Sequence, residues 1–156
     1  MAIWYCVKKD EKHMNDFMQC NWGFHDFKIR KIEYLPDDGT LEMFLLYDEL
    51  EGSVILKFFN VTDLHIAVPD SAYLNYIEGG TLFLNDSEHF VWTDGEGQFE
   101  EQKNISTWIE SEEIYWAVCN KYGLPDEMPK NKVDQTWIIW GKTEQKHFEL
   151  TPYEEK

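Results

Sequence analysis

The residues with the greatest capacity for chemistry in this chain are its carboxylates, because 30 of the 156 residues are Asp or Glu. General acid–base catalysis needs carboxylates whose environments push their pKa values apart. No pair stands out by its spacing, and the neighbours Glu100-Glu101 and Glu112-Glu113 would point to opposite faces of a strand. We therefore assign no catalytic residue and interpret most of these groups as a solvated acidic surface.

The five histidines and three cysteines could bind a metal ion or form a nucleophilic pair. A zinc site is indicated by short spacings such as His-x3-His or Cys-x2-Cys, and neither occurs. A cysteine nucleophile needs an electropositive setting, which a formal charge of −16 does not favour. Glycine-rich phosphate loops are also missing from the sequence. We predict no metal site and no cofactor, and the odd number of cysteines disfavours a disulfide framework.

The balance of charge limits the class of partner. The 14 basic residues, with Arg30 the only arginine, leave a sequence pI near 4.5. A nucleic-acid-binding protein normally carries a basic stripe to meet phosphates, so we expect no nucleic-acid partner. A disordered acidic tail has few apolar residues, whereas 43% of this chain is hydrophobic. The length predicts a single folded domain over residues 1–156.

Half of the net charge falls in one segment, Asp86 to Glu113, which we call the acidic window. It holds nine acidic residues and one basic residue, for a net charge of −8. Aromatic rings lie among these acids, and the combination would give a basic protein partner both steering and contact area. The candidate partner-binding residues are Glu88, Trp92, Asp94, Glu96, Glu100, Glu101 and Glu110. The other interpretation is that strand alternation turns the rings to the core and the acids to water.

Tryptophan is abundant, and five of the seven residues lie in apolar, strand-like segments: Trp92, Trp108, Trp116, Trp137 and Trp140. Ring size favours the core, where each indole N–H needs a hydrogen-bond partner. The alternative is a cleft lined by aromatic rings that binds a small ligand or substrate. The sequence therefore leaves a second class of function open, a ligand-binding or enzymatic β-domain.

Alternating apolar residues between positions 24 and 68 predict three adjacent antiparallel strands. The parity of the first strand changes at Arg30-Lys31, which predicts a β-bulge. Pro36-Asp37-Asp38-Gly39 predicts a tight turn, because Pro presets φ and Gly tolerates positive φ. The third strand starts at Val54 and is apolar on both faces, so we expect it to be central and covered twice.

The remaining elements are short. One helix is predicted at Glu11–Cys20, from the helical spacing of its apolar residues. Besides the three antiparallel strands between positions 24 and 68, strands are predicted at 81–84, 89–93, 105–109, 113–119 and 136–140. The segments between them read as one or two helical turns at 71–77, a turn at 94–97, a loop at 122–133 and a polar tail after 140. The predicted fold is mainly β: an antiparallel β-sandwich or strongly twisted sheet of about seven to nine strands with one or two short helices.

The N-terminal residues bear on the compartment. A short apolar run precedes Lys8 and Lys9, whereas a secretory signal places positive charge first. No stretch is long and apolar enough to be a transmembrane helix. We therefore expect a cytoplasmic protein with no membrane partner, and the oligomeric state stays open.

Three short runs of residues resemble a group of bacterial proteins. They are Trp22-Gly23-Phe24-His25-Asp26, the strand Leu41-x-Met43-x-Leu45-x-Tyr47, and Leu56-x-Phe58-Phe59-Asn60-Val61-x-x-Leu64. Over about residues 22–66 they are similar to small β-rich immunity-protein families, of the immunity protein 50 type. The resemblance implies a cytosolic, non-enzymatic protein that acts by binding another protein. Inhibitors of this kind are often acidic where the surface that they cover is basic, so the implied partner is a basic protein.

Overall fold

The computed structural model of the chain describes residues 4–47, 52–68, 76–120 and 151–153. Within these ranges eight strands form one antiparallel sheet, in the order β2-β3-β4-β7-β1-β8, with β6 paired to β7 and β5 to β6. The strands are β1 (Trp4–Cys6), β2 (Lys28–Leu35), β3 (Thr40–Tyr47), β4 (Gly52–His65), β5 (Thr81–Leu84), β6 (Phe90–Thr93), β7 (Trp108–Asn120) and β8 (Thr151–Tyr153). The helices are α1 (Glu11–Cys20), the 3₁₀ turn η1 (Trp22–Phe24) and α2 (Phe99–Gln102). The predicted mainly β fold is confirmed, in the form of one strongly twisted sheet.

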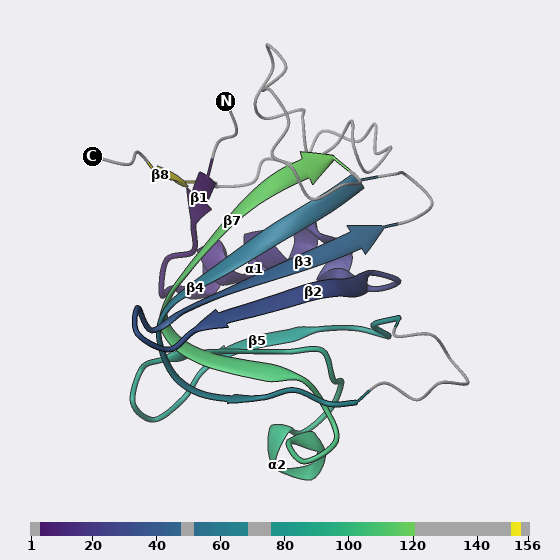
Figure 1. The fold of residues 1–156 in the computed structure, drawn as a ribbon, viewed down its shortest axis with the longest axis vertical. Coiled ribbons are helices and arrows are strands. Elements are labelled where there is room, and N and C mark those ends of the chain that lie inside the picture. Colours follow the sequence, from purple (N-terminus) through teal and green to yellow (C-terminus); the bar gives the residue numbers. More distant parts are fainter. Residues whose placement is uncertain (1–3, 48–51, 69–75, 121–150, 154–156) are drawn as a thin grey trace.

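The two longest strands, β4 and β7, pass through the middle of the sheet and bend it (Figure 1). Strand β7 pairs with β6 at Trp108–Ser111 and with β1 beyond the bend. At the bend, Asn60 of β4 has a left-handed φ of 54°, and the register against β7 shifts between Val61 and Asp63. Because a bulge and a left-handed residue both turn a strand, the sheet curves around its own core.

The core lies on the inner face of the bent sheet and includes helix α1, which lies behind β3 and β4 in Figure 1. Met14, Phe17 and Cys20 of α1 are buried, and the rings of Phe17 and Trp116 lie 5.7 Å apart. Asp10 begins the helix, because its side chain accepts a hydrogen bond of 2.8 Å from the His13 N–H. The sheet contributes a ladder of fully buried side chains: Leu41, Met43, Leu45, Val54, Leu56, Phe58, Trp92 and Ile109.

Several predictions about local structure are confirmed. Helix α1 has the predicted bounds, and strand β2 has a register shift between Ile29 and Lys31. The turn from Pro36 ends at Gly39, whose φ is 65°. Strand β4 is central, between β3 and β7, and Ile55 on its outer side is 4% exposed. The apolar pattern of this strand therefore reports burial on both of its faces at that point.

Other predictions are corrected. Residues 105–109 and 113–119 are not two strands, because β7 is continuous from Trp108 to Asn120 and Ile105 lies outside it, 77% exposed. The acids between positions 110 and 113 interrupt the apolar pattern, but backbone pairing with β4 holds this stretch extended. Strands β1 and β8 and helix α2 were not anticipated, and β8 lies in the predicted polar tail. Of the helical turns predicted at 71–77, residues 71–75 fall outside the described residues, and Tyr76 forms an isolated antiparallel β-bridge with Lys28. The predictions for 122–133 and 136–140 also fall outside the described residues.

The helices of the described part of the chain are short. None of them has the length and apolar character needed to cross a membrane.

Candidate functional site: an acidic groove at the bend of the sheet

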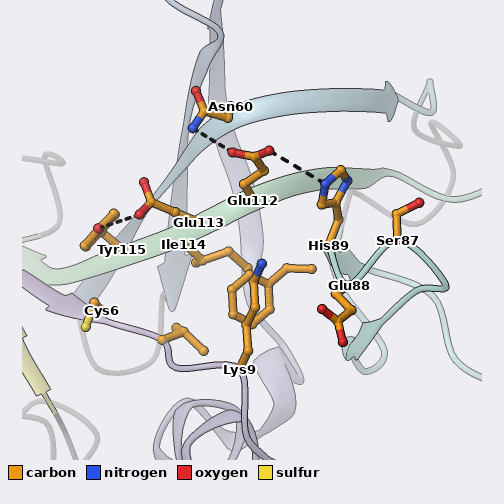
Figure 2. Close-up of a pocket in the computed structure, with 12 residues that line it drawn as sticks. Cys6, Lys9, Asn60, Ser87, Glu88, His89, Glu112, Glu113, Ile114 and Tyr115 are labelled. Carbon is orange, nitrogen blue, oxygen red and sulfur yellow. Dashed lines mark hydrogen bonds and ion pairs between the residues drawn. The ribbon is translucent and has the colours of Figure 1, made fainter.

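A groove with a volume of about 560 Å³ lies where the sheet bends. Its walls come from β1 and the segment after it, from the turn between β5 and β6, and from β4 and β7 at the bend (Figure 2). We call it the corner groove, and its lining residues are Cys6, Val7, Lys9, Asn60, Ser87, Glu88, His89, Phe90, Glu112, Glu113, Ile114 and Tyr115. Segments far apart in the sequence thus form a single site.

The turn between β5 and β6 presents Glu88 and His89 to the groove. The Asn85 side-chain oxygen accepts hydrogen bonds of 3.0 Å from the backbone N–H groups of both Ser87 and His89. Asn85 N–H donates to the His89 carbonyl at 3.0 Å, and Glu88 takes a left-handed φ of 60°. An asparagine that bonds the backbone in this way holds a turn in one conformation. The two side chains are therefore carried by a defined turn.

The bend itself positions Glu112. Asn60 Nδ2 donates a hydrogen bond of 3.0 Å to Glu112 Oε2, across the β4–β7 pair (Figure 2). The Val61 N–H donates to the Gly39 carbonyl at 2.9 Å, which ties the bend to the β2–β3 turn. Asparagine tolerates the left-handed conformation better than most residues. Asn60 therefore both turns the strand and orients a carboxylate of the groove.

His89 lies between two carboxylates of β7. Its Nδ1 is 3.3 Å from Glu110 Oε2, and its Nε2 is 3.8 Å from Glu112 Oε1. Glu110 also accepts hydrogen bonds from Asn85 Nδ2, at 2.6 Å, and from the Thr62 hydroxyl. The side chains of His89 and Glu110 are only 21% and 23% exposed. These hydrogen bonds hold the side chains of Glu110 and His89 in one arrangement beside the groove.

The floor of the groove is apolar and its rim is acidic. Phe90, Ile114 and Val7 are buried, whereas Glu88, Glu112 and Glu113 are exposed at the rim. Lys9 is the one lysine or arginine among the described lining residues, and its Nζ is 5.6 Å from the centre of the Phe90 ring. The described lining residues include three carboxylates and one ammonium group, so their formal charge is −2 with His89 neutral.

The candidate residues of the acidic window divide into separate groups. Glu88 lines the corner groove, and Glu110 is bonded to His89 beside it. Glu96, Glu100 and Glu101 are exposed in and before α2, which follows the other end of β6 and lies at the lower end of Figure 1. The window therefore does not form one continuous acidic face.

The remaining two candidates are the buried Trp92 and the half-buried Asp94. Trp92 is fully buried, and its ring meets that of Phe24 edge-on at 5.5 Å, so it offers no surface to a partner. Asp94 Oδ1 accepts a hydrogen bond of 2.8 Å from the Thr107 N–H. Burial raises the pKa of Asp94 above its usual value, against the lowering effect of that hydrogen bond. We therefore leave Trp92 and Asp94 out of the contact surface.

The aromatic rings of the window lie mainly in the core. Phe90 is buried as Trp92 is, while Phe99 and Trp108 are half-buried and pack edge-on at 5.2 Å. The interpretation that alternation turns rings inward thus holds for the two rings of β6. Trp116 is also buried, whereas Trp137 and Trp140 lie outside the described residues.

Glu88 is the one candidate residue among the described lining residues of the groove, and the residues that the sequence did not single out include Lys9, Asn60, Glu112 and Glu113. Glu112 and Glu113 belong to the acidic window, but their adjacency suggested opposite faces of a strand. Both are exposed in the structure, at the bend where simple alternation fails. Lys9 and Asn60 carry no signal in the sequence, since only the folding of the sheet brings them beside β7.

Comparisons with known proteins give no match: no family model, no curated protein and no solved structure matches this chain. In the part of the chain that the structure describes, no group of three or more His, Cys, Asp or Glu side chains could hold a metal ion. The fold and groove define a structural class, a bent antiparallel sheet with an acidic groove at the bend.

Proposed function

We propose that this chain is a non-enzymatic, acidic, cytoplasmic binding protein that binds a basic protein through the corner groove, in the manner of an immunity-type inhibitor. The observation that carries the proposal is the acidic rim formed by Glu88, Glu112 and Glu113 over an apolar floor. The resemblance to immunity proteins that we infer from short runs within residues 22–66 implies the same kind of action.

Electrostatics favour this class of partner. A chain with a formal charge of −16 attracts a basic surface over long distance and accelerates the encounter. The groove then offers carboxylates for charged contacts and apolar surface for close packing, which are the two parts of an ordinary interface. The Glu112 carboxylate is already held by a hydrogen bond from Asn60, so little ordering is required of it on binding.

The alternative function, a ligand-binding or enzymatic domain with an aromatic-lined cleft, has less support. Two of the rings expected to line such a cleft, Trp92 and Trp116, are packed in the core. Among the described residues, the lining of the corner groove includes no tryptophan. The binding function is therefore the one that the geometry favours.

A salt-dependent capture experiment tests the proposal. The tagged chain is incubated with lysate of its native host at about 0.1 M and about 0.5 M salt, since screening weakens exposed charge contacts. The groove variant Glu88→Gln/Glu112→Gln/Glu113→Gln is compared with Glu33→Gln/Asp37→Asn/Asp38→Asn, which changes the charge equally at exposed sites of the β2–β3 hairpin.

We expect the wild type and the hairpin variant to retain the same basic protein at low salt, and the groove variant to lose it. If that protein stops growth when expressed alone, co-expression of this chain should restore growth, as an inhibitor would. Retention of no basic protein by the wild type, or equal retention by both variants, would overturn the proposal.

A further inference from the structure

The corner groove already contains a cation, and it comes from the chain itself. Lys9 reaches into the middle of the groove, with Glu113 and Tyr115 on one side and Glu88 and His89 on the other (Figure 2). Its Nζ is 5.6 Å from the centre of the Phe90 ring. A cation at this distance from an aromatic centroid is attracted by the ring's charge distribution. The groove is therefore a place that a cationic side chain occupies favourably.

Lys9 is held there weakly. Its side chain is exposed, and it forms no ion pair with any residue that the structure describes. The three rim carboxylates outnumber it, which leaves the lining with a formal charge of −2. A second cation entering the groove would meet uncompensated carboxylates and would have to displace only an exposed lysine.

We propose that the corner groove recognises an arginine side chain of the partner protein, and that Lys9 occupies the groove as a competitor until the arginine replaces it. This inference rests on the proposed function and specifies its chemistry. Arginine fits better than lysine, because a planar guanidinium can lie against an aromatic ring while it donates paired hydrogen bonds to a carboxylate. The carboxylates come from two elements: Glu88 from the β5–β6 turn, and Glu112 from β7, where Asn60 and His89 hold it (Figure 2).

The probe is a capped peptide, Gly-Gly-Arg-Gly-Gly, titrated into the full-length chain and followed by NMR. The control probe replaces arginine by citrulline, which has nearly the same shape and no charge. We expect the arginine peptide to shift the backbone signals of Glu88, His89, Glu112 and Glu113 in particular. Equal shifts with citrulline, or shifts concentrated at the α2 carboxylates Glu100 and Glu101, would overturn the inference.

Two lysine variants separate displacement from a general change of charge. Lys9→Ala empties the groove, and we expect the dissociation constant of the arginine peptide to fall about two- to fivefold, the scale of one exposed cation–π contact. Lys8→Ala removes the same charge from the neighbouring exposed residue, which is not in the lining, and should change the constant by less than twofold. Equal effects of the two variants would show that Lys9 does not compete for the groove.

The peptide experiment and the capture experiment can fail independently. If the chain captures no basic protein but the arginine peptide binds at the groove and responds to Lys9→Ala, the proposed function is wrong, and the part of the inference that stands is the competition between arginine and Lys9 for the groove. If a basic protein is captured through the groove and the peptide results are negative, the function stands and the arginine assignment is wrong.

Discussion

At the scale of single residues, the carboxylates of this chain have quite different environments. Glu100 and Glu101 are exposed on α2, whereas Glu110 is bonded to His89, Asn85 and Thr62. Asp94 is the acid whose pKa is raised by burial. Residue type alone predicted one solvated acidic surface. The surroundings instead distinguish exposed charges on α2, the hydrogen-bonded Glu110 beside the groove, and Asp94, which accepts a hydrogen bond from the backbone.

The raised pKa of Asp94 makes a prediction with a definite sign. The folded chain holds the Asp94 proton more tightly than the unfolded chain does, so this residue lowers stability as pH rises through its titration. Asp94→Asn keeps an oxygen for the Thr107 N–H without the charge. We expect Asp94→Asn to be more stable relative to the wild type at about pH 7 than at about pH 3.5, as measured by the free energy of unfolding in urea.

Asp94→Ala serves as the control for this prediction. It removes the acceptor from the Thr107 N–H as well as the charge, so it should be less stable than Asp94→Asn by about 1–3 kcal/mol at both pH values. A loss of stability of Asp94→Asn relative to the wild type as the pH rises would contradict the assignment.

At the scale of elements, the bend in β4 and β7 creates the groove. It brings the segment after β1, the β5–β6 turn and the middle of β7 together, although these are distant in sequence. Asn60 is the residue on which this geometry depends, because it combines a left-handed backbone with the hydrogen bond to Glu112. A regular pair of strands at this point would carry its side chains on two opposite faces.

Substitution of Asn60 separates its backbone role from its side-chain role. Asn60→Gly keeps a residue that adopts positive φ freely but loses the bond to Glu112, whereas Asn60→Ala loses both. We expect Asn60→Ala to be less stable than Asn60→Gly by about 1 kcal/mol in urea unfolding, the scale of the left-handed penalty. Equal stability of the two variants would mean that the backbone of residue 60 relaxes without cost.

At the scale of the whole molecule, the formal charge of −16 and the apolar interior oppose one another. Like charges on a compact chain repel and lower its stability, while they favour solubility and attraction to basic partners. The described lysines offset part of the repulsion locally, as Lys103 does with Glu100 at 2.7 Å and Lys57 with Glu42 at 3.5 Å. The excess of acids over bases leaves most of it in place.

Salt should therefore stabilise the isolated chain while it weakens partner binding. Raising sodium chloride from about 0.01 M to about 0.5 M shortens the screening length from about 30 Å to a few Å. We expect Tm to rise by several degrees in a thermal melt followed by circular dichroism. A lower Tm at high salt would show that attractive ion pairs, such as Lys12 with Asp16, outweigh the general repulsion.

The sequence by itself determined the features that depend on local pattern. The helix Glu11–Cys20, the bulge near Arg30 and the turn at Gly39 follow from periodicity and turn chemistry, which act over a few residues. The alternating apolar positions of β3 and β4 also predicted the central place of β4, because a strand covered on both faces must be apolar on both.

Only the tertiary structure decided where the charges meet. The acidic window is continuous in sequence, yet β6 carries its middle away from its two ends, with Glu88 and Glu113 at the groove and Glu100 on α2. Lys9 and Asn60 join Glu112 through the bend and the pairing of β1, β4 and β7, which are contacts between distant segments. Local periodicity cannot report such contacts, because the direction of a side chain at a bend is set by the strands that pair there.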